Sequence, residues 1–203
     1  IGGIVWIVAE EAGSYIASFD LDDFRSEVRS FFMSGVSAQK LQIQPELLTS
    51  LHWDILADAV NFSRVHADVL SDAHWTGGHP GEGKVYGYAS YACPPCIGLI
   101  ALRNPQVIAQ NFTFTLRDTL AVPRSSTEHA QWNIEHIWDP VEPPRVLEQA
   151  NQSLPRSNAS GKSTGTTPNG RNAHANWKGV RLDQPITLEM HGLELITLRV
   201  EHD

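Results

Sequence analysis

Asp72, His74 and Trp75 lie close together in the sequence and combine side chains that can bind a sugar. An indole ring can stack on the apolar face of a pyranose, while neighbouring polar groups take its hydroxyl groups. The same residues also suit a structural role, in which Trp75 packs between two parts of the protein and His74 caps a turn. From the residues alone the structural role is the favoured interpretation, and a substrate-binding turn is the alternative.

Asp68 and Asp72 are the nearest candidates for paired catalytic carboxylates. Glycosidic bonds are hydrolysed by two carboxyl groups about 5–10 Å apart, and a spacing of four residues at a helix end permits this. A carboxylate near a helix C-terminus is electrostatically disfavoured, however, and nothing else marks a cleft here. We therefore do not assign the pair to catalysis, and the catalytic residues stay unknown.

Cys93 and Cys96 are the only cysteines and form the motif Cys-Pro-Pro-Cys. A redox site of this kind opens a helix, whereas residues 97–102 read as a strand. A zinc site needs two further ligands from elsewhere. The favoured interpretation is a hairpin tip whose thiols are free or joined in a local disulfide, ahead of metal binding and redox catalysis.

No pattern in the sequence indicates a bound metal or cofactor. His66, His74 and His79 are the nearest histidines, and their spacing matches no compact ligand motif. The segment around Gly161 and Lys162 resembles a phosphate-binding loop but lacks the required earlier glycine. We predict no metal and no cofactor.

Charge and hydropathy exclude some classes of partner. The chain has 203 residues and a net charge of -8, and residues 1–83 carry 12 acidic and 4 basic residues. Nucleic-acid binding needs a concentrated basic face, so no nucleic acid is expected. No apolar run approaches the ~20 residues of a membrane span, so no membrane partner is expected. The location stays open, with a secreted or periplasmic protein among the alternatives.

The first 70 residues alternate strand and helix patterns. A short apolar run at 4–9 predicts a buried strand, and the stripe of Leu21, Phe24, Val28, Phe31 and Phe32 predicts a helix that stops at Gly35. Residues 38–43 predict a strand, and Thr49 caps a helix expected to reach about Val69. This order fits the last β/α units of a barrel or of another α/β fold.

From Lys84 onward the pattern changes to strands. Strands are predicted at 84–91, 96–102, 111–116 and 129–138, followed by a final pair at 185–189 and 193–200 that turns at His191-Gly192. Short strands separated by turns predict an antiparallel β-sandwich. A long polar loop is expected at about 145–181.

Several motifs occur in the order found in bacterial relatives of alpha-galactosidases, often catalogued as enterotoxins. Ala38–Pro45 resembles their Leu-Gln-Glu-Leu-Tyr-Ile-x-Pro, with Lys40 at the Glu position, and Leu48–Ala57 resembles Leu-Thr-Pro-x-x-Trp-Asp-x-Leu-Ala. Asp72–Trp75 is similar to Asp-Thr-His-Trp, and Leu102–Pro105 to Leu-Arg-Asn-Pro. Cys93 and Cys96 depart from the pattern of the family's hairpin turn.

This resemblance implies a fold of class α/β plus all-β, with the end of a (β/α)8 barrel in 1–75 and a β-sandwich in 76–203. It implies a glycosidase acting on alpha-linked sugars whose catalytic carboxylates precede Ile1, which makes the chain a fragment, inactive alone. Gln44, at a strand end, and Asp72, His74 and Trp75 are its predicted substrate-binding residues. The expected partners are a carbohydrate and the missing barrel portion or another chain. The alternative is a non-catalytic carbohydrate-binding or structural sandwich.

Overall fold

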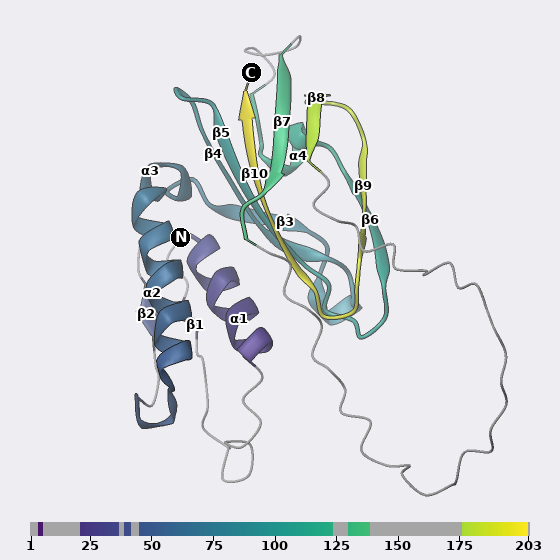
Figure 1. Ribbon diagram of the computed structural model, residues 1–203. Coiled ribbons are helices and arrows are strands. Elements are labelled where there is room, and N and C mark those ends of the chain that lie inside the picture. Colours follow the sequence, from purple (N-terminus) through teal and green to yellow (C-terminus); the bar gives the residue numbers. More distant parts are fainter. Residues whose placement is uncertain are drawn as a thin grey trace, which may run out of the picture.

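The computed structural model describes residues 4–5, 21–36, 39–41, 45–123, 130–138 and 176–202. Within them, a helical layer lies beside an antiparallel β-structure (Figure 1). The helical layer includes a parallel pair of short strands, β1 (Ile4–Val5) and β2 (Lys40–Leu41). Both fall within the ranges predicted as strands, whose remaining residues lie mostly outside the described part.

Helix α1 (Leu21–Met33) confirms the predicted apolar stripe. Phe24, Val28 and Phe31 are buried in a core shared with the next long helix. Gly35 follows the last turn with a φ of 123°, a backbone conformation that favours glycine and ends the helix.

Helix α2 (Ser50–Val65) follows a short 3-10 turn, η2 (Pro45–Leu47), and ends earlier than predicted. The chain leaves helical geometry at His66, whose φ is -106°, and starts again as α3 (Ala67–Leu70). The backbone N–H of His66 still donates to the carbonyl of Phe62, as in a regular helix, and its ring Nδ1 lies 3.0 Å from the same oxygen. None of the helices in the described part of the chain is long and apolar enough to span a membrane.

The β-structure consists of two antiparallel sheets that share one apolar core. The large sheet has the strand order β3-β4-β5-β10-β7-β8 and the small one pairs β6 with β9. The strands of the large sheet are β3 (His74–Gly77), β4 (Tyr86–Ala92), β5 (Ile97–Arg103), β7 (Gln131–His136), β8 (Trp177–Arg181) and β10 (Leu195–His202). Those of the small sheet are β6 (Gln110–Phe114) and β9 (Ile186–Met190), and the short helix α4 (Leu116–Thr119) closes the core. The arrangement is that of an antiparallel β-sandwich, as predicted.

Three details of the predicted strand pattern need correction. Strands β9 and β10 do not form a final hairpin, because the turn at His191-Gly192 carries the chain from the small sheet to the large one. Strand β8 lies within the range 145–181 predicted as a polar loop, of which 145–175 is outside the described residues. Strand β3 was not predicted as a strand, and the 3-10 turn η3 (Pro80–Glu82) follows it. The strand spans residue 75, where the barrel part was expected to end.

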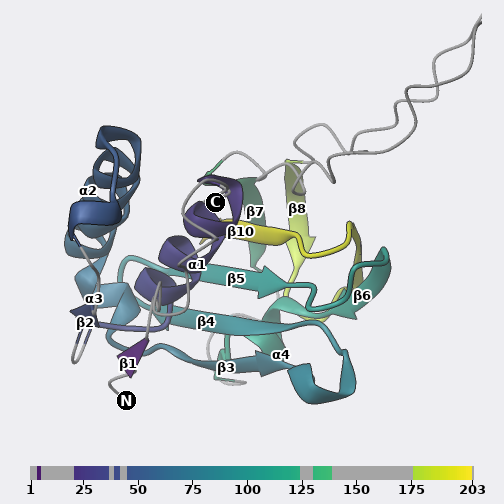
Figure 2. The ribbon, with the colours of Figure 1, turned by 90° about the horizontal axis from the view of Figure 1, so that it is seen from below.

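Both faces of the large sheet are covered at β5, one of its two central strands. Ile100 and Leu102 face the sandwich core, while Leu99 and Ala101 belong to a second core with α1 and α3 residues such as Met33 and Leu70. Strand β3 forms the edge of this sheet beside β4 and β5, as Figure 2 shows from below. The helical layer therefore packs on one face of the sheet, and the small sheet packs on the other.

Candidate functional site

Three of the four predicted binding residues lie at strand β3, and the fourth, Gln44, is outside the described residues. Asp72 is exposed just before the strand, and His74 and Trp75 are its first two residues. Successive residues of a strand point to opposite faces of the sheet. His74 and Trp75 therefore do not form one binding surface, although they are neighbours in sequence.

His74 is held by the fold. Its Nε2 lies 2.9 Å from the carbonyl oxygen of Thr119 at the end of α4, and its Nδ1 lies 3.0 Å from the carbonyl oxygen of Asp72. The Asp72 carboxylate is close as well, with 3.9 Å between Oδ2 and Nδ1. This geometry matches the turn-capping interpretation of His74 and leaves Trp75 as the more accessible residue of the two.

Trp75 is the centre of an aromatic cluster on the opposite face. Its ring stacks on Tyr86 with 5.2 Å between centroids and an interplanar angle of 11°, and it meets Tyr88 edge-on at 5.6 Å. Trp75 is nevertheless 47% exposed. We call Trp75, Tyr86 and Tyr88 the aromatic platform.

A charged group borders the aromatic platform. The register of β4 and β5 places Arg103 opposite Tyr86, and the Arg103 guanidinium forms ion pairs with Glu27 and, at 3.6 Å, with Asp23 of α1. Burial disfavours the charge of Arg103, but Glu27, Tyr86 and Asp23 more than offset this and raise its pKa. The guanidinium thus stays charged, while the Asp23 side chain remains 65% exposed.

Tyr88 of the platform keeps its proton at neutral pH. Burial raises the pKa of Tyr88, and the neighbouring Tyr86 raises it further. A protonated phenol both donates and accepts hydrogen bonds. The site therefore combines flat apolar rings with hydroxyl, guanidinium and carboxylate groups, which can pack on a flat apolar surface and form hydrogen bonds at its rim.

Sequence reasoning found Trp75 but not Tyr86, Tyr88 or Arg103. Tyr86 and Tyr88 alternate within a predicted strand, which is a signal that could have placed both on one face. It did not indicate which strands lie beside them, because strand register and sheet order depend on the whole fold. Arg103 was noted only as part of a motif.

Asp68 and Asp72, the carboxylates not assigned to catalysis from the sequence, are both exposed: Asp68 lies on α3 and Asp72 lies beside His74. Burial raises the pKa of Glu194, but this residue is only 8% exposed and its Oε2 accepts the backbone N–H of His191 at 2.7 Å. Its role is to hold a turn.

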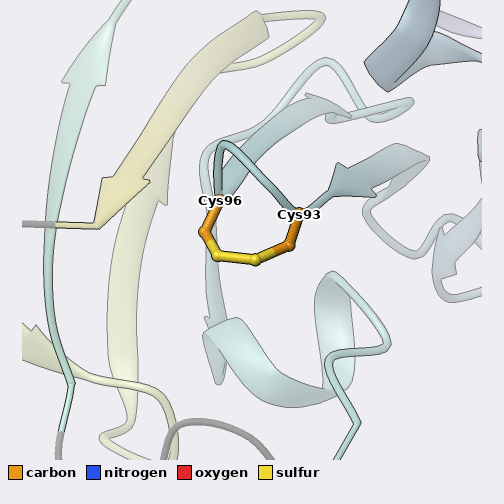
Figure 3. The surroundings of a disulfide bond; sticks show 2 residues. All are labelled: Cys93 and Cys96. Atoms are coloured by element: carbon orange, nitrogen blue, oxygen red, sulfur yellow. A yellow bond between two sulfur atoms is a disulfide. The ribbon is translucent and has the colours of Figure 1, made fainter.

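The cysteine pair forms a disulfide across the turn between β4 and β5 (Figure 3). Ala92 and Ile97 pair on either side of it, so the turn closes a regular hairpin. This is the local disulfide of the favoured interpretation.

His66 and His79 form hydrogen bonds in different parts of the fold. His66 bonds to Phe62, and His79 accepts the N–H of Gly81 within its own loop. In the part of the chain that the structure describes, no three histidine, cysteine or acidic side chains come together to hold a metal ion.

The chain is similar in structure to sugar-cleaving enzymes. An alpha-galactosidase from Saccharomyces cerevisiae, solved with raffinose, matches 90% of this chain and 44% of its own length, with 11% identity and a TM-score of 0.52. Alpha-galactosidase I from Mortierella vinacea matches 96% and 38%, with 10% identity and a TM-score of 0.51. A Bacillus halodurans protein assigned as an alpha-N-acetylgalactosaminidase matches 92% and 33%, with 12% identity and a TM-score of 0.51.

These likenesses show a shared fold. The chain spans less than half the length of each of these proteins. No protein-family model and no curated protein matches its sequence.

Proposed function

We propose that the chain forms the C-terminal part of a glycoside hydrolase-like protein that acts on alpha-linked sugars. The observation that carries this proposal is the asymmetric match to sugar-cleaving enzymes, which covers 90% or more of this chain but only 33–44% of theirs. The catalytic carboxylates then lie outside these 203 residues. The resemblance of the sequence motifs to bacterial, enterotoxin-type relatives of alpha-galactosidases belongs to the same proposal.

The helical layer supplies the second argument. The parallel pair β1 and β2 alternates with α1 and α2, which is the pattern of β/α units. In the proposal these units are the end of a (β/α)8 barrel, whose active site lies at the C-terminal ends of its strands. Gln44 comes three residues after the end of β2 in sequence, and in this proposal it lies at such a strand end.

The reaction in the parent protein would use two carboxyl groups across the glycosidic bond. One donates a proton to the leaving oxygen while the other attacks the sugar and forms a covalent glycosyl intermediate. In this proposal, the described residues contribute no catalytic group, and many of them pack the sandwich against the helical layer. Arg103 contributes most directly, because it joins β5 to α1 through Glu27.

Hydrolysis assays test the proposal. The protein in its longest native form should hydrolyse p-nitrophenyl alpha-galactoside or alpha-N-acetylgalactosaminide, and the 203-residue chain alone should not. Hydrolysis by the isolated chain would place catalytic groups inside it, and an inactive longer protein would overturn the hydrolase assignment.

A non-catalytic carbohydrate-binding module is the second candidate, favoured by the half-exposed ring of Trp75. It predicts that the chain binds sugars without cleaving them, even when no hydrolase activity accompanies the longer protein. Binding and hydrolysis therefore need to be measured separately.

A further inference from the structure

Trp75 is a large apolar ring at the open edge of a sheet. It belongs to β3, the edge strand of the large sheet (Figure 2). Its ring stacks on that of Tyr86 on the neighbouring strand. Tyr88 supports it from the side. An indole ring that is 47% exposed but fixed by two other rings loses little conformational entropy when it binds a ligand.

Polar groups lie next to Tyr86, the middle ring in the order of strands β3, β4 and β5. Arg103 faces Tyr86 in the register of β4 and β5, and it draws Asp23 and Glu27 of α1 toward the same border. The side chains of Asp23 and Glu27 are 65% and 39% exposed, so their oxygens can accept hydrogen bonds from solvent-side groups. An apolar ring face with carboxylate acceptors at its border complements a molecule that is apolar on one face and hydroxylated along its rim.

We propose that the aromatic platform and its border of Arg103, Asp23 and Glu27 form a saccharide-binding surface on this chain. The indole of Trp75 stacks on the C–H face of a terminal pyranose, and the Asp23 carboxylate accepts a rim hydroxyl. An axial hydroxyl at C4 leaves the opposite ring face lined by C–H groups, so a galacto-configured ring fits the stack better than a gluco-configured one. Only the choice of an alpha-galactoside as ligand rests on the proposed function.

The size of the platform favours a sugar over a protein partner. A stable protein interface covers about 800 Å² on each side. Three rings, two of them half-buried between strands, offer an area suited to one or two pyranose units. The border also carries acidic groups and a paired arginine, which does not suit an anionic lipid surface.

Titration of the 203-residue chain with methyl alpha-galactopyranoside, followed by NMR, tests the proposal. Methyl alpha-glucopyranoside serves as the competing sugar. The informative variants are Trp75→Ala, Trp75→Phe and Asp23→Asn. Trp53→Ala is the matched control, because Trp53 is 44% exposed on α2 and takes no part in the platform.

The expected result is binding of the galactoside that Trp75→Ala weakens about tenfold or more, as removal of an aromatic anchor does. Trp75→Phe should retain part of the affinity, Asp23→Asn should weaken it less than Trp75→Ala, and Trp53→Ala should leave it unchanged. Thermal unfolding of each variant checks that the fold is intact.

Absence of galactoside binding, or equal binding by Trp75→Ala, would overturn the inference. So would self-association of the chain that Trp75→Ala abolishes without any sugar binding, because the platform would then contact a second copy. These outcomes are distinct from failure of the proposed function, which concerns hydrolysis by the longer protein and not binding by this chain.

Discussion

The two faces of the large sheet differ in what their side chains do. On the inner face, residues such as Ile100, Leu102 and Leu198 are fully buried against the small sheet. On the outer face, Leu99 and Ala101 are buried under α1 and α3, but the same face continues at the sheet edge into the aromatic platform and Arg103. One face is therefore used for stability alone, and the other combines packing with groups that can bind a ligand.

The substitution expected to lower the free energy of unfolding most is at Gly87, where strands β4 and β5 approach closely. A Cβ atom at Gly87 would lie 1.7 Å from the backbone oxygen of Ala101, which cannot move without breaking the β4–β5 pairing. Gly87→Ala should therefore lower the free energy of unfolding by about 3 kcal/mol or more, measured by urea denaturation.

Gly98→Ala is its control. At Gly98 the added atom meets the end of the buried Leu120 side chain, which shifts more readily than backbone, so Gly98→Ala should lower the free energy of unfolding less than Gly87→Ala does. An equal loss in both variants would show that the backbone contact is not the cause.

Truncation of one side chain on each face compares the faces directly. Leu102→Ala on the inner face should cost about 2–5 kcal/mol, because it leaves a cavity in a closed core. Trp75→Ala on the outer face should cost only about 1 kcal/mol, the value of an aromatic contact at a half-exposed position. Similar losses in chemical denaturation would remove the distinction between the faces.

Arg103 links the outer face to the helical layer. Arg103→Ala should lower stability by about 1–3 kcal/mol, because a largely buried guanidinium and its bond to Glu27 are lost. Arg199→Ala removes a more exposed arginine of β10 that pairs with Glu201, and should cost about 0.5 kcal/mol or less. The prediction is wrong if the two substitutions are equally costly in the same denaturation assay.

The smallest effect is expected from the protonation of His52. Its Nδ1 accepts the backbone N–H of Thr49 at the start of α2, and burial lowers its pKa below the ordinary value of 6.5. The unfolded chain then takes up the proton more readily, so stability is lost as the pH falls below 6.5.

His52→Gln keeps an acceptor at this helix position and should remove this part of the pH dependence. Unfolding curves between pH 7 and pH 5 measure how much stability each of the two proteins loses as the pH falls. In the wild-type protein this loss should affect the helical layer before the sandwich. An unchanged pH dependence in His52→Gln would contradict the assignment.

Local patterns predicted most of the elements and only part of the candidate site. The stripe of Phe24, Val28 and Phe31 and the alternation in residues 111–114 were sufficient for α1 and β6, because periodicity reports burial directly. Strand β3 was missed, since four residues that include glycine and follow a helix carry little periodicity. Strand β8 was missed because it follows a long polar segment.

The motif around Asn104 shows how a sequence pattern gains its meaning from the structure. The Asn104 side chain is fully buried, its Nδ2 donates to the carbonyls of Ile108 and His191 at 2.8 Å, and its Oδ1 accepts from Gln106 and Gln110. It ties the loop after β5 to the turn before β10, while the preceding Arg103 reaches α1. The motif alone could not indicate the hydrogen-bond partners of Asn104 or the contact of Arg103 with α1, since residues such as His191 lie far along the chain.

By itself, the sequence determined most of the helices and strands and the antiparallel sandwich of the second half. The tertiary structure alone decided that His74 and Trp75 face opposite sides and that Tyr86, Tyr88 and Arg103 gather beside the indole. The physical reason is that local periodicity is a property of neighbouring residues, whereas strand order and register follow from the burial of the whole core.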